Sequence, residues 1–308
     1  MRPLPTPEEF RAAAKRLTPW ELRQGLWMKR EDLFAPLGPG GVNGSKLRQL
    51  GWLFENRPRG ARRVITAASA LSPQHCMTAV LSRIHGLPSH HVTAAEPSRH
   101  PSTEIARLMG ATFTRTAVGY NPALQSSLKK LQTEEDFVVP YGITTEAANE
   151  LAPFHAVGAA QVINLPEAVE TLVVPFGSGN SLTSIICGLL WHGRKNLRVL
   201  RTVAIGPDRV KWVTGRLWRM GIEADHLPFE WDGGTSLHET GYASYGDRMP
   251  ETYDGAVMHP TYEAKIVRWA KENGELGKWQ DGKTAFWVVG SEPKVEAHRA
   301  FTSPGVGA

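Results

Sequence analysis

Short apolar runs alternate with helical patterns along most of the chain, and this alternation constrains the fold more than any other feature. Residues 64–68 form one such run. The apolar residues that follow it recur at i, i+3, i+4 and i+7, the spacing of one helix face: Met77, Val80, Leu81 and Ile84. Two parallel strands need a crossover of this kind between them, so the pattern predicts parallel α/β sheets.

The alternation continues along the rest of the chain. Further strands are expected at residues 91–95, 111–116, 137–140, 171–176, 199–205 and 284–289, and helices at 102–109, 122–131, from 181 onward and at 209–220. Residues 229–255 are rich in Gly, Asp, Tyr and Ser and are expected to form an irregular loop. We expect two α/β domains, each an open, mostly parallel, twisted sheet with helices on both faces. Residues 51–146 form the smaller domain, and residues 1–50 with 147–308 form the larger one.

Composition excludes several classes of protein. With 308 residues, 41% of them hydrophobic, the chain can bury one large core or two modest ones. It has no apolar run of the roughly 18 residues that a transmembrane helix needs, and its N-terminus lacks the apolar region of a signal peptide. We therefore expect a cytoplasmic protein without a membrane partner. The two cysteines, Cys76 and Cys187, cannot form a disulfide framework or a cysteine-based zinc site.

The chain is mildly basic, with a formal net charge of +5. An excess of this size favours anionic ligands only weakly. It is compatible with a phosphate-bearing cofactor, with a nucleic acid, or with no particular ligand. The reason for the excess therefore stays open.

A glycine-rich turn, Gly177-Ser178-Gly179-Asn180-Ser181, follows an apolar run directly and opens an expected helix. Glycines allow backbone N–H groups to approach an oxyanion, the two hydroxyls add donors, and the helix dipole favours negative charge. An ordinary βα turn would have the same composition. The turn has neither the Gly-Lys-Ser/Thr of a Walker A loop nor the third glycine of the dinucleotide fingerprint.

A second glycine-rich segment lies upstream, where Gly40-Gly41-Val42-Asn43-Gly44-Ser45 precedes Lys46. Lys46 opens an expected helix whose apolar residues can pack inward: Leu47, Leu50 and Phe54. The positive end of the helix dipole, together with partial burial, would disfavour the charged form of this lysine and favour the neutral amine that a Schiff base needs. A solvated surface lysine is the alternative, since it describes most lysines.

Together these segments resemble the pyridoxal-phosphate enzymes of the tryptophan-synthase β-like fold (fold type II), nearest the branch of 1-aminocyclopropane-1-carboxylate deaminase and D-cysteine desulfhydrase. The carrying residues are Lys29-Arg30-Glu31-Asp32, Lys46 and the turn 177–181. By this resemblance pyridoxal 5'-phosphate is the cofactor, and the larger domain binds it. Lys46 then forms the Schiff base, Asn43 lies beside the cofactor, and residues 177–181 hold the phosphate.

A third segment, His259-Pro260-Thr261-Tyr262-Glu263-Ala264-Lys265, looks like the Asp-Pro-x-Tyr-x-Gly-Lys of that branch. The resemblance implies that Tyr262 lies near the cofactor ring and Glu263 near the pyridine nitrogen, where a carboxylate would keep the nitrogen protonated. Tyr245 is similar to a tyrosine that faces the substrate in the branch. Ser291 follows Gly290 where the branch has a glycine pair, so Ser291 is expected beside the cofactor.

One segment departs from the branch. Where the branch has Ser-Asn-x-x-Arg, this chain has Ser72-Pro73-Gln74-His75-Cys76. Ser72 matches the serine and is expected in the catalytic site, whereas Pro73 replaces the asparagine that contacts the cofactor ring. Ser69, Gln74 or His75 could take over that contact, and the sequence does not choose between them.

The histidines around residue 90 are a weaker signal. His90, His91 and His100, with Glu96 between them, do not have the spacing of a known zinc motif. We expect exposed loop histidines and no metal site.

Two further groups of residues are assigned to ordinary structural roles. The basic run is expected to be a solvated turn, because a nucleic-acid contact needs a larger basic face with interleaved aromatics: Arg57, Arg59, Arg62 and Arg63. Three tryptophans fall in helical patterns and are expected in the core or in an interface: Trp212, Trp218 and Trp269.

Three hypotheses of function follow. The first is a pyridoxal-phosphate-dependent lyase or deaminase that acts on a small amino acid by β-elimination or ring opening with release of ammonia, with Lys46 as the proton-transfer base and Tyr245 and Tyr262 framing the substrate. The second keeps the cofactor and places the amino group on a larger anionic substrate, such as a nucleotide or a nucleic acid. The third is a non-catalytic relative that acts as a binding protein, which Pro73 supports. By the resemblance, the protein is expected to be a homodimer.

Overall fold

The computed structural model describes residues 2–94, 96 and 100–301, and its contacts divide the chain into two compact units. The small-sheet unit comprises Met1–Lys15, Ala35–Thr145 and Glu292–Ala308, and the large-sheet unit comprises Arg16–Phe34 and Glu146–Ser291. Ala95, at the end of the expected strand 91–95, lies outside the described residues.

The small-sheet unit is built around four parallel strands in the order β5-β4-β3-β6. The strands are β3 (Arg63–Ala67), β4 (Ser89–Thr93), β5 (Thr112–Arg115) and β6 (Asp136–Val139). The helices are α1 (Pro7–Ala14), α2 (Ser45–Glu55), α3 (Gln74–Ile84), α4 (Pro101–Leu108), α5 (Asn121–Leu131) and α11 (Val295–Arg299). Helix α5 packs on one face of the sheet through an apolar cluster, and α3 contacts the same two central strands, β3 and β4.

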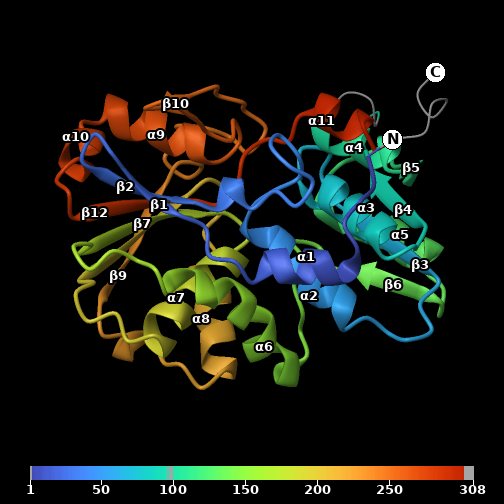
Figure 1. The fold of residues 1–308 in the computed structure, drawn as a ribbon, viewed down its shortest axis with the longest axis horizontal. Helices are drawn as coiled ribbons and strands as arrows, with labels where there is room; N and C mark the ends of the chain where they lie inside the picture. Colours follow the sequence, from blue (N-terminus) through green and yellow to red (C-terminus); the bar gives the residue numbers. More distant parts are fainter. Residues whose placement is uncertain (1, 95, 97–99, 302–308) are drawn as a thin grey trace. The chain divides into compact units, whose positions relative to one another are not determined.

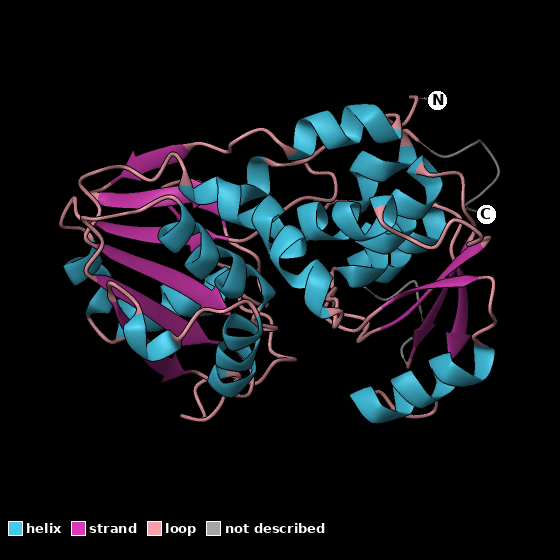
Figure 2. Cartoon of the chain, turned by 90° about the horizontal axis from the view of Figure 1, so that it is seen from below, coloured by secondary structure: helices cyan, strands magenta, loops and turns pink. Residues whose placement is uncertain are grey.

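The large-sheet unit contains six strands in the order β1-β2-β12-β7-β8-β9, and every neighbouring pair except β1–β2 is parallel. Figure 2 shows the strands of this sheet side by side in magenta, with helices in cyan against them. The strands are β1 (Trp20–Arg23), β2 (Leu26–Arg30), β7 (Thr171–Phe176), β8 (Val199–Ala204), β9 (Glu230–Ser236) and β12 (Thr284–Val288), with a separate hairpin of β10 (Thr252–Tyr253) and β11 (Ala256–Val257). The helices are α6 (Ala148–Ala159), α7 (Asn180–Trp191), α8 (Val210–Arg219), α9 (Glu263–Glu272) and α10 (Glu275–Trp279), and the short 3-10 helices are η1 (Glu31–Leu33), η3 (Ala160–Val162) and η4 (Ala224–His226).

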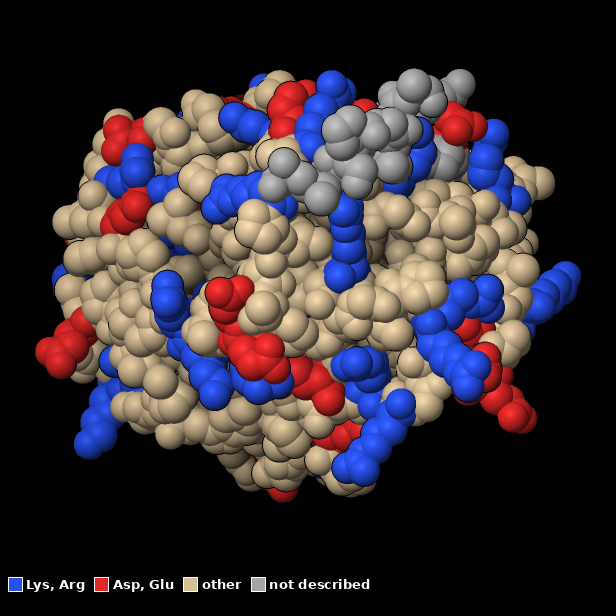
Figure 3. All heavy atoms as spheres, turned by 45° about the vertical axis from the view of Figure 1, so that its right-hand side comes forward, with Lys and Arg blue, Asp and Glu red and all other residues tan. Residues whose placement is uncertain are grey.

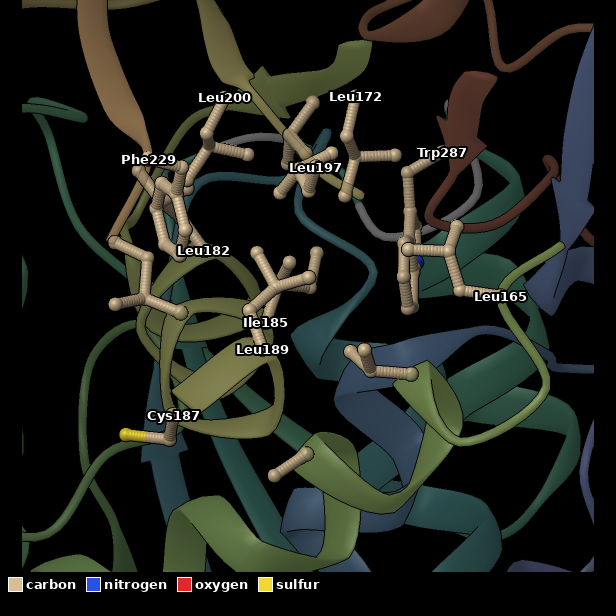
Figure 4. Close-up of a cluster of buried hydrophobic side chains, with 14 of the residues drawn as sticks. Leu165, Leu172, Leu182, Ile185, Cys187, Leu189, Leu197, Leu200, Phe229 and Trp287 are labelled. Carbon is tan, nitrogen blue, oxygen red and sulfur yellow. The ribbon is translucent and has the colours of Figure 1, made fainter. Parts of the chain in front are cut away.

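Both faces of the six-stranded sheet are buried, which is why its strands appear in the sequence as continuous apolar runs. In β7, Leu172 and Val174 join the cluster with α7 and α8, whereas Val173 joins the cluster with α9 and α10. Figure 1 shows these two pairs of helices on opposite sides of the sheet. Figure 4 shows the first cluster, in which Leu172 from the sheet and Ile185 from α7 are both fully enclosed. Each such side chain contributes about 1.5–3 kcal/mol to stability.

The expected fold class is confirmed, and the boundaries of most elements agree with the sequence pattern to within a few residues. The prediction for one segment was wrong. Residues 229–255 were expected to form an irregular loop, but Glu230–Ser236 is the edge strand β9, paired in parallel with β8. Its pattern misleads because an edge strand leaves most side chains half-buried or exposed. Gly234, with φ +76°, makes the register shift opposite Thr202, whose carbonyl oxygen would lie 1.4 Å from a Cβ.

The compact units and the sequence-based domains share the same strands but differ in their flanking segments. Residues 2–15, 35–50 and 292–301 were assigned to the larger domain, whereas contacts group them with the small sheet. The reason is helix packing, since α1 contacts α2, α2 contacts α3, and α11 contacts α4. The N–H of Lys294 also donates to the carbonyl of Gly40 at 2.8 Å.

Within the described residues, no helix combines the length and the apolar composition that crossing a bilayer requires.

Two glycines in neighbouring helices test the packing of α7. A Cβ on Gly188 of α7 would lie 2.4 Å from the carbonyl oxygen of Ala159, whereas a Cβ on Gly215 of α8 would meet nothing within 4 Å. We expect Gly188→Ala to lower the free energy of unfolding by about 1–3 kcal/mol through overpacking, and Gly215→Ala to raise it by about 0.5–1 kcal/mol through helix propensity. Urea unfolding measures both. Equal stabilisation by the two substitutions would contradict the close approach of α7 and α6.

Candidate active site

The carboxyl ends of β7 and β12 carry most of the predicted site residues of the large-sheet unit. Residues 177–181 follow β7 directly, and Asn180 and Ser181 open helix α7. Gly179 is the N-cap of this helix with φ +91°, and no side chain caps the first turn. The first N–H groups of a helix lack intrahelical partners and carry the positive end of its dipole. The turn can therefore bind an anion through its backbone.

The two glycines of the turn differ in how closely they are packed. A Cβ on Gly177 would lie 3.8 Å from Ile205 and 3.9 Å from the ring of Tyr262. A Cβ on Gly179 would lie only 2.7 Å from the ring of Trp212. Ser178 between them is half-buried. A substituted residue 179 would therefore be strained both by its backbone conformation and by this ring.

Glu263 is a fully buried carboxyl group at the first position of α9. Its Oε1 accepts a hydrogen bond from the N–H of Val289, at the end of β12, at 2.8 Å. Its Oε2 has no hydrogen-bond partner among the described residues. Burial raises the pKa of Glu263 to about 8, and the negative charge of Asp32 acts in the same direction. Ser291 follows Val289 by two residues and is half-buried.

Two tyrosine hydroxyls meet in the same unit. Tyr245 Oη lies 2.8 Å from Tyr262 Oη, and the two rings approach edge to face. The ring of His259 packs against Tyr262 with 4.7 Å between the ring centroids. Fully buried Lys265 donates to the carbonyls of Ser244, at 2.6 Å, and Tyr245, at 3.3 Å. This ammonium therefore fixes the backbone that presents Tyr245.

Lys46 and Asn43 belong to the small-sheet unit. Lys46 is the second residue of α2 and is half-buried, and Gly44 precedes the helix with φ +100°. Asn43 is buried, and its amide donates to the carbonyl of Gly41 at 2.8 Å. The expected packing of this helix is confirmed, because Leu47, Leu50 and Phe54 are fully buried.

The segment that departs from the branch has a clear internal arrangement. Gln74 is buried, and its amide donates to Thr66 Oγ1 at 2.6 Å while its oxygen accepts from the N–H of Gly142 at 2.9 Å. His75 is also buried, with Nε2 3.1 Å from the carbonyl oxygen of Ala68. Both side chains thus stabilise the small sheet. Ser72 is half-buried, and its Oγ accepts from the N–H of Gln74 at 3.3 Å.

Two of the three histidines were not the exposed loop residues that we expected, whereas His100 lies in the loop before α4 and is half-buried. His90 and His91 lie within β4, and His91 is fully buried against His75, with 3.1 Å between their Nδ1 atoms. Burial holds the pKa of His75 at about 4 and that of His91 well below its usual value, so both rings are neutral. Among the described residues, no three His, Cys, Asp or Glu side chains are grouped so as to hold a metal ion.

Three residues near the turn 177–181 were not singled out as site residues from the sequence. Trp212 contacts Gly179, Arg216 packs on the ring of Trp212, and His155 contacts Arg216. The spacing of Trp212 and Arg216, one helical turn, is the only local signal that could have indicated this group. A cavity of about 280 Å³ lies elsewhere, before the amino ends of β7 and β8, and is lined in part by Leu165, Arg194 and Lys195.

Comparison with solved structures identifies the fold. A homologue of ACC deaminase has a TM-score of 0.67 at 18% identity, covering 94% of this chain and 95% of its own. O-acetylserine-dependent cystathionine β-synthase from Helicobacter pylori has a TM-score of 0.57 at 17% identity, covering all of both chains. A fungal L-serine ammonia-lyase from Rhizomucor miehei has 0.55 at 15% identity, covering 94% and 99%. At such identities the likeness concerns the fold.

A sequence relative decides the family. The O-seryl-dTMP PLP-dependent decarboxylase of Salmonella phage ViI is 30% identical over an alignment of 351 positions, gaps included, which covers 91% of this chain and 81% of the relative. The chain belongs to the fold type II pyridoxal-phosphate-dependent enzymes. No protein-family model matches it.

The residues of this fold type II enzyme fit pyridoxal phosphate at two points. The turn 177–181 offers backbone donors at a helix N-terminus, which suit a phosphate. The buried Oε2 of Glu263, with no partner among the described residues, suits a protonated ring nitrogen. A cation at that position would lower the raised pKa of the carboxyl group and favour its charged form.

Glu263→Gln tests the burial of this carboxyl group in the cofactor-free protein. The folded state keeps the Glu263 proton up to about pH 8, whereas the unfolded chain loses it near pH 4.3. Between these values the folded state binds more protons, so stability falls as the pH rises, by up to about 1.4 kcal/mol per pH unit from this group. We expect Glu263→Gln to flatten this fall in urea unfolding measured across the interval.

The matched control is Glu134→Gln, on an exposed residue. It should leave the pH dependence of the wild type unchanged. A Glu263→Gln variant with the same slope as the wild type would show that Glu263 is ionised in the folded, cofactor-free protein.

Proposed function

We propose that this enzyme decarboxylates an amino acid that is attached to a nucleotide. The observation that carries the proposal is the 30% identity, over 91% of the chain, to a relative named as an O-seryl-dTMP decarboxylase. In this reaction the bond from the α-carbon to the carboxylate breaks, CO2 leaves, and a proton is added at the α-carbon. The product is an amine that remains attached to the nucleotide.

The roles of the residues follow from their chemistry and from the resemblance of the sequence to its family. Bound pyridoxal phosphate supplies an electron sink for the electron pair left at the α-carbon. In the proposal, Lys46 would attach the cofactor through its Nζ and would deliver the proton that is added at the α-carbon once CO2 has left. The N–H groups and hydroxyls of residues 177–181 bind the phosphate. Glu263, as a carboxylate, would accept a hydrogen bond from the protonated ring nitrogen and keep that nitrogen charged.

The remaining predicted site residues line the substrate and the cofactor ring in this proposal. Tyr245 and Tyr262 share a hydrogen bond between their hydroxyls, so one of them can donate to the substrate while the other accepts. Ser72, Asn43 and Ser291 contact the cofactor or the substrate in this proposal. We further propose that the enzyme is a cytoplasmic homodimer.

The distribution of charge supports a nucleotide rather than a long polyanion. On the face shown in Figure 3, Lys and Arg side chains alternate with Asp and Glu and form no continuous basic field. In the basic run, Arg62 pairs with Glu135 and Arg63 with Asp136, at 3.4 and 2.7 Å. A polynucleotide is bound mainly through uncompensated Lys and Arg. A single nucleotide needs fewer such contacts.

A second candidate is deamination of a small amino acid by β-elimination or ring opening. The paired hydroxyls of Tyr245 and Tyr262 favour it, because the corresponding tyrosines in the resembling branch adjoin the cofactor ring and the substrate. The two candidates differ in their products. Decarboxylation releases CO2, whereas deamination releases ammonia and a 2-oxo acid.

The deciding experiment incubates the protein, loaded with pyridoxal phosphate, with O-seryl-dTMP, with the same group in a DNA oligonucleotide, and with free amino acids of both hands and 1-aminocyclopropane-1-carboxylate. Mass spectrometry and assays for CO2 and ammonia report the products. We expect CO2 and a nucleotide-linked amine from O-seryl-dTMP. Turnover of the oligonucleotide alone would assign a nucleic acid as substrate, and ammonia from free amino acids would favour deamination. A bound cofactor without any turnover would indicate a binding protein.

Lys46→Ala tests the attachment of the cofactor. We expect this variant to lose the near-visible absorbance of a lysine-bound cofactor, because no other residue supplies the amine, while its circular dichroism stays that of the wild type. The control is Lys211→Ala, on an exposed residue of α8, which should keep the absorbance. A Lys46→Ala variant that keeps the lysine-bound absorbance would assign the role to another lysine.

A further inference from the structure

We propose that Trp212 is a positioning residue for the cofactor phosphate, and that buried Arg216 fixes its ring beneath the turn 177–181. The proposal rests on the proposed phosphate-binding role of that turn. It concerns contacts within the large-sheet unit alone, on helices α6, α7 and α8, which contact one another (Figure 1).

The turn 177–181 contacts the indole ring of Trp212 directly. A Cβ on Gly179 would lie 2.7 Å from Cζ3 and 2.8 Å from Cε3 of Trp212, and 3.0 Å from Val213. The backbone of Gly179 therefore lies directly on the ring. Gly179 is also the N-cap of α7, where the N–H groups that would face the phosphate begin. A shift of this ring would change the direction of those N–H groups.

The side chain of Arg216 fixes the Trp212 ring. The guanidinium carbon of Arg216 lies 4.5 Å from the centroid of the Trp212 ring, a cation–π geometry. Arg216 is only 2% exposed, and its Nη1 pairs with Glu146 Oε1 at 2.8 Å. The other carboxylate oxygen of Glu146 pairs with Arg219 at 2.9 Å. Arg216 is thus held on one side by the carboxylate and on the other by the indole ring.

The guanidinium of Arg216 is also linked to α7, the helix that the turn 177–181 opens. Arg216 Nε donates to His155 Nε2 at 3.5 Å, and His155 Nδ1 lies 2.9 Å from Ser184 Oγ on α7. Burial lowers the pKa of His155 to about 3, so the ring is neutral and can accept this hydrogen bond. A Cβ on Gly158 would lie 2.8 Å from Ser184 Cβ, so α6 and α7 are closely packed here. These contacts therefore connect the turn to α7 through Trp212, Arg216 and His155.

Packing alone would not require this set of residues. An apolar side chain at position 216 would fill the space without the desolvation of a buried guanidinium, which also lowers the pKa of Arg216. The contact with Arg216 instead holds the Trp212 ring in one orientation. It also places the positive charge of Arg216 one helical turn from Trp212, the residue that supports the turn 177–181. Both features suit a turn that must present its N–H groups to a phosphate.

The test measures the binding of inorganic phosphate and of pyridoxal phosphate to the cofactor-free protein by calorimetry. We expect Trp212→Leu to weaken both affinities about tenfold, a loss of about 1.4 kcal/mol, and Trp212→Phe, which keeps a flat ring, to retain most of the affinity. Arg216→Met should weaken binding in the same direction. The matched control is Trp218→Leu on the same helix, where the side chain is 72% exposed, and it should bind as the wild type does.

Wild-type affinity in a folded Trp212→Leu variant would overturn the proposal. If that variant does not fold, tryptophan fluorescence decides, because phosphate should change the emission of the wild type and of Trp218→Phe but not that of Trp212→Phe. A phosphate-induced change in the emission of Trp212→Phe as large as that of the wild type would contradict a contact between the ring and the phosphate turn. A wild type that binds neither ligand would instead overturn the proposed function.

Discussion

The parallel hydrogen bonding of β12, β7 and β8 is the constraint on which the rest of the large-sheet unit depends. Because the three strands run in one direction, their carboxyl ends lie at one edge, where open parallel sheets bind ligands. The turn 177–181 leaves β7 there, and the N–H of Val289, just beyond β12, meets Glu263. A shift of one residue in this register would exchange the two buried faces of each strand. The same register that closes the core therefore also assembles the edge that carries the site.

Two kinds of electrostatic support are built into that edge, and neither needs surface charge. The N-terminus of α7 can hold a phosphate through its backbone N–H groups. The buried carboxyl group of Glu263 stays neutral until a cation pairs with it. The net charge of +5 is therefore not required for the cofactor. It remains available for an anionic substrate, which agrees with a nucleotide-linked amino acid.

Much of the fold could be predicted from the sequence because local rules govern it. Buried parallel strands are continuous apolar runs, glycines precede both α2 and α7, and the helix faces follow a period of 3.6. The strand β9 was not predicted because, at the edge of the sheet, its side chains are only half-buried or exposed and two glycines lie at its register shift. The contact of Arg216 with Glu146 joins residues 70 positions apart, and the burial of His91 depends on a helix from another part of the chain. Such features depend on tertiary packing, which no local pattern encodes.

We propose that Lys46 carries the cofactor of this fold type II enzyme. The most direct measurement loads the protein with pyridoxal phosphate, reduces it with borohydride so that the lysine–cofactor bond becomes permanent, and locates the added mass in proteolytic peptides. We expect one modified residue, Lys46, in the peptide that contains Gly44-Ser45-Lys46. Modification at another lysine, for example buried Lys29 or Lys265, or no modification after complete loading, would contradict it.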